Sequence, residues 1–329
     1  MEYNETYEKI LPMVSSEKEV NKMKSGKLTR CILILMIVCG SWLMLADVSV
    51  YGAVTGLNAD GGLNSIILAK GLFVVVGGDG TILTSPDRLT WTERESGTEN
   101  SLNDVTYENG IFVAVGGDGT ILTSPEGITW TVRQSGSSST LTGINYLNDT
   151  FVAYGRDGAV VTSKDGVTWE ARATKTDSTI YDIIHAGGIY VAVGADGTIA
   201  SSKDSVSWTA IESVTESTLR GITYIKDTFV AFGGDGTILT SKDAASWTLR
   251  SIGTESTIYG VIYMNGIFVV VGADGTILTS SDARSWSRRD SGTESTLRGI
   301  TYRDGTFIVI GDDRTVLTSS DGINWSSKE

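Results

Sequence analysis

Residues 116–130 read Gly-Gly-Asp-Gly-Thr-Ile-Leu-Thr-Ser-Pro-Glu-Gly-Ile-Thr-Trp, and close variants of this stretch return along the rest of the chain. Tryptophan marks the repeat most clearly. It recurs every 39 residues, at Trp91, Trp130, Trp169, Trp208, Trp247, Trp286 and Trp325. A fixed period of this size indicates one supersecondary unit that is copied in tandem.

One copy contains four short runs that are rich in β-branched and aromatic residues, at 102–107, 111–116, 120–124 and 129–133. Turn residues bound each run, so each is predicted to be a β-strand. Asp-Gly between the second and third runs is a strong hairpin signal, because both residues tolerate positive φ. The pair recurs at Asp79, Asp118, Asp157, Asp196, Asp235 and Asp274, whereas the last copy has Asp313-Arg314.

Four antiparallel strands in about 40 residues match one propeller blade. The sequence therefore predicts an all-β fold, a seven-bladed β-propeller of four-stranded antiparallel blades, over residues 53–329. The blades are expected to begin near residues 63, 102, 141, 180, 219, 258 and 297. One blade cannot cover its own faces, so neighbours must stack, and each tryptophan is expected to wedge between adjacent blades.

Each tryptophan follows a short motif such as Ser163-Lys164-Asp165 or Ser319-Ser320-Asp321, with the acid four residues before the indole. This motif resembles the Asp-box, or BNR, repeat of sialidases and related propellers, Ser-x-Asp-x-Gly-x-Thr-Trp, although the tryptophan lies one residue closer. The resemblance covers residues 63–329 and implies a propeller blade rather than an activity. We expect the Ser and Asp side chains to accept backbone N–H bonds in a tight turn. This structural role is favoured over a ring of catalytic or metal-binding acids, and no cofactor is expected.

The chain has 329 residues and a net charge of −13. Residues 1–52 contain equal numbers of acidic and basic side chains, so the repeats carry the whole net charge. An acidic surface repels phosphate backbones, which argues against a nucleic-acid partner. Both cysteines, Cys31 and Cys39, precede the repeats, so the predicted propeller has no disulfide and no thiolate metal site.

An uncharged apolar run spans residues 31–46, and Lys22, Lys24, Lys27 and Arg30 precede it. Its length suits a signal-peptide core better than a spanning helix. We divide the chain into a charged segment (1–30), a signal peptide or membrane anchor (31–52) and the propeller, which is expected to be secreted or displayed at the cell surface. Translation from Met23 would leave a compact signal peptide with cleavage near Ala53. Any membrane contact is expected only through this segment.

Ligand-binding candidates are sought where the copies differ, because a single ligand is asymmetric. The first strand of each unit is expected to line the central channel. Its second residue is Asn, Asn or Thr in the first three units and then Tyr181, Arg220, Tyr259 and Arg298. Aromatic and arginine side chains in a concave setting suit a glycan, a carboxylate or a peptide. Arg156 and Asp312, in the turns between second and third strands, add to the candidate surface; the alternative is that all of these side chains only fill and solvate the channel mouth.

A second candidate is a ring of acids in the connections between units, at Asp60, Glu99, Asp177, Glu216, Glu255 and Glu294. These acids either attract a cationic partner or hold their own loops by accepting backbone N–H bonds, and we favour the loop role. The single histidine, His185, occupies a position where five other copies have tyrosine. Without a second histidine or a reactive cysteine it is expected to be structural.

Three functions remain open. We favour a monomeric, non-catalytic binding scaffold outside the cytoplasm, whose ligand is a glycan or a surface protein at the channel mouth. The sialidase resemblance implies a glycoside hydrolase as an alternative, but the uniform period admits none of the insertions that build such a site. The short blades also resemble photosystem II assembly factors of the Ycf48/HCF136 type, and that resemblance implies an assembly role.

Overall fold

The computed structural model describes residues 62–327, which form seven four-stranded antiparallel sheets and confirm the predicted seven-bladed β-propeller. The first strands of the blades are β1 (Leu63–Ala69), β5 (Leu102–Glu108), β9 (Leu141–Leu147), β13 (Ile180–Ala186), β17 (Leu219–Ile225), β21 (Ile258–Met264) and β25 (Leu297–Arg303). The second strands are β2 (Leu72–Gly77), β6 (Ile111–Gly116), β10 (Thr150–Gly155), β14 (Ile189–Gly194), β18 (Thr228–Gly233), β22 (Ile267–Gly272) and β26 (Thr306–Gly311).

The third strands are β3 (Ile82–Ser85), β7 (Ile121–Ser124), β11 (Ala159–Ser163), β15 (Ile199–Ser202), β19 (Ile238–Ser241), β23 (Ile277–Ser280) and β27 (Val316–Ser319). The fourth strands are short: β4 (Thr92–Glu93), β8 (Thr131–Arg133), β12 (Glu170–Ala173), β16 (Trp208–Ile211), β20 (Thr248–Arg250), β24 (Ser287–Arg289) and β28 (Ser326–Ser327). In the described part of the chain the one helical element is a 3-10 turn, η4 (Gly117–Gly119).

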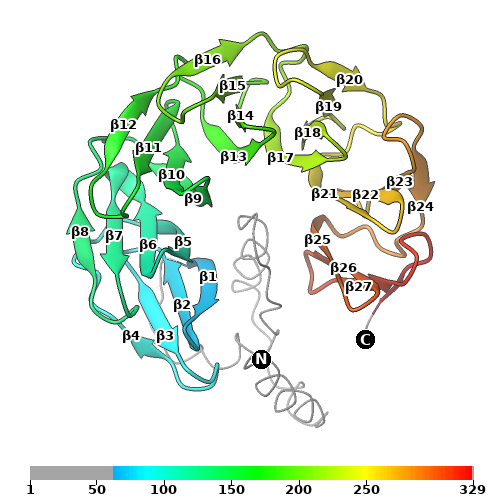
Figure 1. Cartoon of the computed structure of the whole chain (residues 1–329). Helices are drawn as coiled ribbons and strands as arrows, with labels where there is room; N and C mark the ends of the chain where they lie inside the picture. The colour runs from blue at the N-terminus through cyan, green and yellow to red at the C-terminus, as the bar shows by residue number, and fades with distance from the viewer. Residues whose placement is uncertain (1–61, 328–329) are drawn as a thin grey trace, which may run out of the picture.

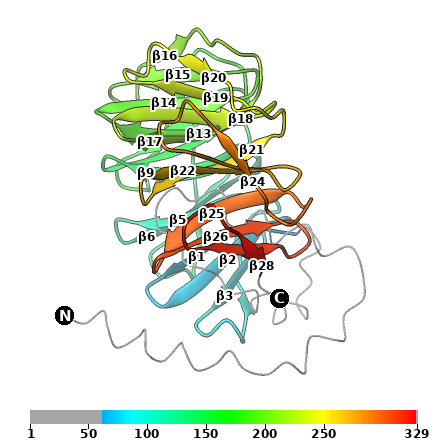
Figure 2. The ribbon, with the colours of Figure 1, turned by 90° about the vertical axis from the view of Figure 1, so that its right-hand side faces the viewer.

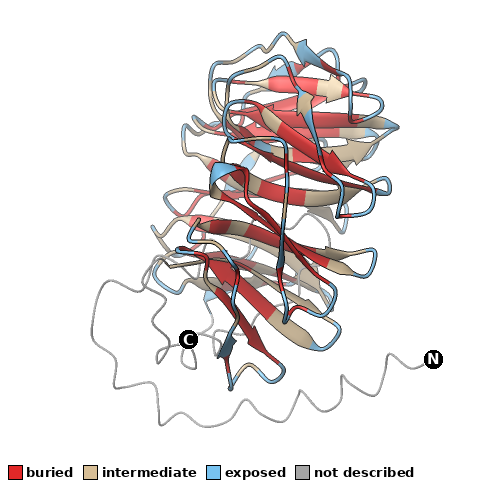
Figure 3. Cartoon of the chain, turned by 90° about the vertical axis from the view of Figure 1, so that its left-hand side faces the viewer, coloured by how far each residue is buried: buried red, intermediate tan, exposed pale blue. Residues whose placement is uncertain are grey.

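The blades follow one another around a common axis, with the first strands inside and the fourth strands outside (Figure 1). In the view turned by 90°, the strands of successive blades are stacked one above another (Figure 2). Buried residues fill the middle of the strands, whereas the turns at their ends are exposed (Figure 3). The innermost strand of each blade pairs on one edge only, so its other edge is free to face the neighbouring blade or the channel.

The Asp-Gly turns adopt the predicted left-handed geometry, as at Asp118 (φ 50°) and Gly119 (φ 66°). Glycine is needed at Gly119 for a second reason. A Cβ there would lie 1.9 Å from the carbonyl oxygen of Ser137, in the linker to the next blade. The turn and the linker therefore lie against each other at one end of the blade, which we call the linker end.

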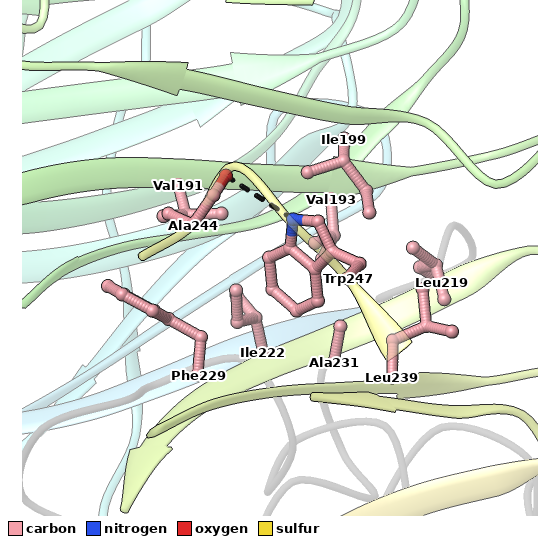
Figure 4. Packing of buried hydrophobic residues seen from close by; sticks show 10 residues of the cluster. All are labelled: Val191, Val193, Ile199, Leu219, Ile222, Phe229, Ala231, Leu239, Ala244 and Trp247. Atoms are coloured by element: carbon pink, nitrogen blue, oxygen red, sulfur yellow. Dashed lines mark hydrogen bonds between the residues drawn. The ribbon is translucent and has the colours of Figure 1, made fainter. Parts of the chain in front are cut away.

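Tryptophan wedges between adjacent blades, as predicted. Trp247 of the fifth blade packs against Val191, Val193 and Ile199 of the fourth, together with Leu219 and other residues of its own blade (Figure 4). Its indole N–H donates to the carbonyl oxygen of Ala244 at 3.3 Å. Equivalent clusters join the other neighbouring pairs from the first blade to the seventh.

The hydrogen bonds predicted for the Ser-x-Asp motif are present. In the third blade, Ser163 Oγ accepts from the N–H of Gly166 at 2.9 Å, and Asp165 Oδ1 accepts from Val167 and Thr168 at 2.8 and 2.7 Å. The two backbone donors are the main reason that the pKa of Asp165 falls to about 2. The motif therefore fixes the turn that precedes Trp169.

The first and last blades are the exception to this stacking. No hydrophobic cluster of the described residues joins them, and among residues 62–327 the cluster that contains Trp91 is made up of residues of its own blade. Phe73, whose counterparts in the other blades are buried, is half-buried, and so are Ile308 and Val316 on the last blade.

Candidate functional site

The candidate site lies on the innermost strands, and the same irregularity places its side chains in every blade. The second residue of each first strand is a β-bulge, because the pairing with the second strand skips it. A bulge releases a residue from the ladder and redirects its side chain. In the first blades this side chain reaches the next blade: Asn64 Nδ2 donates to Leu102 O and Asn103 Nδ2 to Leu141 O, both at 2.8 Å.

From the fourth blade onward the bulge residues form a stack of rings and guanidinium groups, which we call the arc: Tyr181, Arg220, Tyr259 and Arg298. The guanidinium carbon of Arg220 lies 6.0 Å from the ring centre of Tyr181 and 5.6 Å from that of Tyr259. Arg298 lies 5.2 Å from the same Tyr259 ring. The structure thus brings together the four side chains selected from the sequence, and cation–π contacts of this kind hold guanidinium groups against aromatic faces.

Asp312 neutralises one end of the arc. It lies in the turn after β26 and accepts two hydrogen bonds from Arg298, to Oδ1 at 3.0 Å and to Oδ2 at 2.8 Å. These bonds are the largest of the interactions that raise the pKa of Arg298 above its ordinary value. Asp312 is therefore a partner of the arc rather than a free acid.

Arg220 is different from Arg298. It is exposed, and within residues 62–327 no salt bridge engages it. Tyr181, on one side of it, is 38% exposed. The arc therefore presents one guanidinium group that is stacked between two aromatic rings and keeps its hydrogen-bond donors free of any carboxylate in the described chain.

Arg156, the remaining candidate, is exposed in the turn between β10 and β11 of the third blade. Its backbone N–H donates to Thr140 O at 2.9 Å, as the turns of the other blades do to their own linkers. Among the described residues no hydrogen bond, salt bridge or cation–π contact links its side chain to the arc.

The residue after the bulge is a carboxylate in two blades, buried at Asp104 and half-buried at Asp182. Asp104 accepts from Ser65 Oγ of the first blade at 2.8 Å and from Ile144 N of the third blade at 3.0 Å. Asp182 accepts from Ile222 N of the fifth blade at 3.1 Å. Burial raises the pKa of Asp104 to about 7 and that of Asp182 to about 6, although the hydrogen bonds to both oppose this shift.

Four of the other blades have glycine where Asp104 and Asp182 stand, and the first has Ser65. In two of the blades with glycine an aromatic ring from the second strand takes the space. A Cβ on Gly143 would lie 2.7 Å from the ring of Tyr154, and a Cβ on Gly221 would lie 2.5 Å from that of Phe232. The partners of Asp104 and Asp182 in the ladder are the smaller Val115 and Val193. In these four blades the same position is thus filled either with a carboxylate or with a ring from the adjacent strand.

Five of the linker acids are exposed at the linker end: Glu99, Asp177, Glu216, Glu255 and Glu294. Asp60 lies outside the described residues. The loop-holding role that we expected of these carboxylates falls to the preceding hydroxyl group, as where Ser256 N donates to Thr254 Oγ1 at 3.1 Å and Ser217 N to Thr215 Oγ1 at 3.0 Å. The acids therefore contribute negative potential to the same end of the ring as the arc.

His185 is half-buried, and its ring lies 4.4 Å from that of Tyr190. Burial lowers the pKa of this imidazole. Within the part of the chain that the structure describes, no group of three or more His, Cys, Asp or Glu side chains is placed to hold a metal ion.

Comparison with known proteins supports the fold. No family model matches the chain, and no curated protein matches its sequence. Among solved structures it is similar to the computationally designed Ika8 protein (TM-score 0.65, 19% identity, 78% of this chain and 83% of that one). It is also similar to YCF48 bound to a D1 peptide (TM-score 0.59, 17% identity, 80% and 92%) and to the WD40 β-propeller domain of Doa1 (TM-score 0.57, 16% identity, 83% and 95%).

Sequence comparison of the copies did not single out Asp104 and Asp182. A signal was available, because an acid replaces serine or glycine at a position next to the bulge. The bulge itself was also missed, since its cause is the pairing of two strands and not the type of the skipped residue.

Proposed function

We propose that this protein is a non-catalytic binding scaffold that holds a protein partner at the channel mouth on the arc. The observation that carries the proposal is Arg220, an exposed guanidinium group between two tyrosine rings with no carboxylate partner in residues 62–327. A carboxylate on the ligand can take both donors of such a fork, and the flanking rings provide apolar contact.

The charge around the arc limits the chemical classes of ligand that can bind there. The linker acids are exposed at the same end of the ring, and the chain carries a net charge of −13. This field repels a polyanion and attracts a cation. The ligand that fits is therefore a segment with one carboxylate among neutral or basic residues, such as the free C-terminus of a basic peptide.

The solved neighbours agree with a partner-binding role. YCF48, which is similar in fold, was solved with a bound D1 peptide, and the Doa1 structure that is similar in fold is a WD40 β-propeller domain. The hydrolase alternative needs an acid that is free to act, and in the described arc Asp312 is engaged by Arg298. An assembly factor is also a protein that binds a partner. Only the identity of the bound partner would distinguish an assembly factor from another binding scaffold.

We also propose that the propeller works outside the cytoplasm, either secreted or at the cell surface. The apolar run at 31–46 and the basic residues before it support this proposal. Within residues 62–327 no helix has the length and apolar character needed to cross a membrane. N-terminal sequencing of the mature protein tests export: a start near Ala53 indicates cleavage, and retention of residue 31 onward in a membrane fraction indicates an anchor.

The binding test uses the full chain and N-acetylated basic peptides with a free C-terminal carboxylate. We expect binding that weakens at least about tenfold on C-terminal amidation, since a charge-assisted pair is worth about 1.5–3 kcal/mol. The double variant Tyr181→Ala/Arg220→Ala should lose this discrimination, whereas Arg284→Gln, an exposed arginine in the box turn of the sixth blade, should keep it. An array of glycans with acidic sugars is tested in parallel. Binding to glycans but to no peptide, or peptide discrimination that survives Tyr181→Ala/Arg220→Ala, would refute the proposal.

A further inference from the structure

Asp182 occupies the junction between the first two members of the arc. It follows Tyr181 directly in β13, and its Oδ2 accepts a hydrogen bond from the backbone N–H of Ile222 in β17 at 3.1 Å. Ile222 lies two residues after Arg220. One side chain therefore ties together the two strand segments that carry Tyr181 and Arg220.

The N–H of Ile222 needs such a partner. Strand β17 pairs with β18 only, so the donors on its other edge have no strand to bond. A backbone donor left unsatisfied away from water costs free energy. The carboxyl group of Asp182 satisfies this donor across the interface between the fourth and fifth blades.

The later junctions of the arc have no equivalent tie. The position of Asp182 is glycine in the next three blades, Gly221, Gly260 and Gly299. At those junctions no side chain next to the bulge bonds the following innermost strand among the described residues; the bond from Asn265 Nδ2 to the Tyr302 hydroxyl, at 2.7 Å, lies at the opposite end of β21 and β25. The junction of Tyr181 with Arg220 is thus the one in the described arc where a side chain adjacent to the bulge ties the two strands together.

We propose that Asp182 is a positioning residue of the arc: its bond to Ile222 fixes β13 against β17 and thereby seats the guanidinium group of Arg220 on the ring of Tyr181. The inference about geometry is independent of any ligand, and only its consequence for affinity rests on the proposed function. Because the bond uses an acceptor oxygen and not a charge, the amide of asparagine should replace it.

The test uses NMR of the arginine Nε–H groups in the full chain, where the tyrosine rings shift the Arg220 signal. Asp182→Ala should move this signal toward the value of a solvent-exposed arginine, and Asp182→Asn should restore it. Asp182→Gly, which copies the residue of the next three blades, serves if the alanine variant does not fold. The matched control is Asp104→Ala, which removes the corresponding bond to Ile144 far from the arc and should leave the Arg220 signal in place.

The second readout is the affinity for the N-acetylated basic peptide. Asp182→Ala should weaken it several-fold, up to about tenfold, while Asp182→Asn and Asp104→Ala stay near the wild type. An unmoved Arg220 signal in Asp182→Ala, or an equal movement in Asp104→Ala, overturns the inference. If the wild type binds no peptide, the proposed function fails, and the NMR result still decides whether Asp182 positions the arc.

Discussion

The carboxylate of Asp104 accepts a hydrogen bond from the backbone N–H of Ile144, 3.0 Å away on the neighbouring blade. Asp104 is only 1% exposed and also holds Ser65 of the blade on its other side. One side chain thus connects three consecutive blades at the inner wall. Its pKa, raised by burial to about 7, means that the folded protein binds a proton there more tightly than the unfolded chain does.

The first prediction concerns pH. Since the pKa of Asp104 rises from 3.8 to about 7 on folding, its stabilising contribution is complete below pH 4 and is lost as the pH rises through 7. Asp182, with a pKa of about 6, acts in the same direction. Each pKa unit is worth about 1.4 kcal/mol, so the loss at Asp104 is at most about 4 kcal/mol.

Urea unfolding at intervals between pH 4.5 and 8 measures this slope. Asp104→Asn should flatten it, even if the amide lowers stability at every pH by satisfying fewer of the donors. Asp165→Asn is the control, since that exposed acid has a pKa of about 2 and acts only below this range. A slope that is identical in wild type and Asp104→Asn contradicts the assignment.

The second prediction concerns the indole wedge. Trp169 is 7% exposed and packs in a cluster with Val113 and Val115 of the second blade. Trp169→Ala should lower the free energy of unfolding by about 3–5 kcal/mol, because it leaves a cavity between two blades. Val167→Ala, two residues earlier and 42% exposed, should change it by less than about 0.5 kcal/mol. A melting curve unchanged by Trp169→Ala would remove the evidence for the wedge.

The third prediction separates backbone strain from crowding. Gly110 (φ 83°) and Gly119 (φ 66°) both have positive φ, but a Cβ on Gly110 meets nothing within 4 Å whereas one on Gly119 meets Ser137 O at 1.9 Å. Gly110→Ala should cost about 1–2 kcal/mol from the left-handed conformation alone. Gly119→Ala should cost clearly more, because the linker must also move. Equal costs in denaturant unfolding would mean that the linker yields freely.

The fourth prediction concerns the first and last blades of the propeller. The terminal faces carry half-buried residues such as Phe73 and Ile308, and no described cluster joins them. We expect amide hydrogen exchange to be faster in β1–β4 and β25–β28 than in the central blades, since local opening follows the loss of buried contacts. Fastest exchange in a central blade would contradict this expectation.

Much of the fold could be predicted from the sequence because every blade repeats the same pattern of strands, turn residues and tryptophan. The period of Trp130 and Trp169 gave the number of blades, and Asp118-Gly119 gave the position of a turn whose φ angles the structure confirms. The candidate side chains Tyr181 and Arg220 were also visible as departures from the repeat, and whether they bind a ligand stays a prediction.

The sequence by itself determined the strands, the turns and the indole wedge, since these depend on contacts within one repeat or between identical neighbours. Tertiary structure alone decided which unlike residues meet. The pairing of Arg298 with Asp312 depends on the bulge within one blade, where β25 pairs with β26. The stack of Arg220 between two tyrosines and the bond from Ile144 to Asp104 depend on neighbouring blades as well. Residue types in a single repeat do not show these contacts, because the bulge arises from the pairing of two strands and the contacts between blades arise only when one sheet packs against the next.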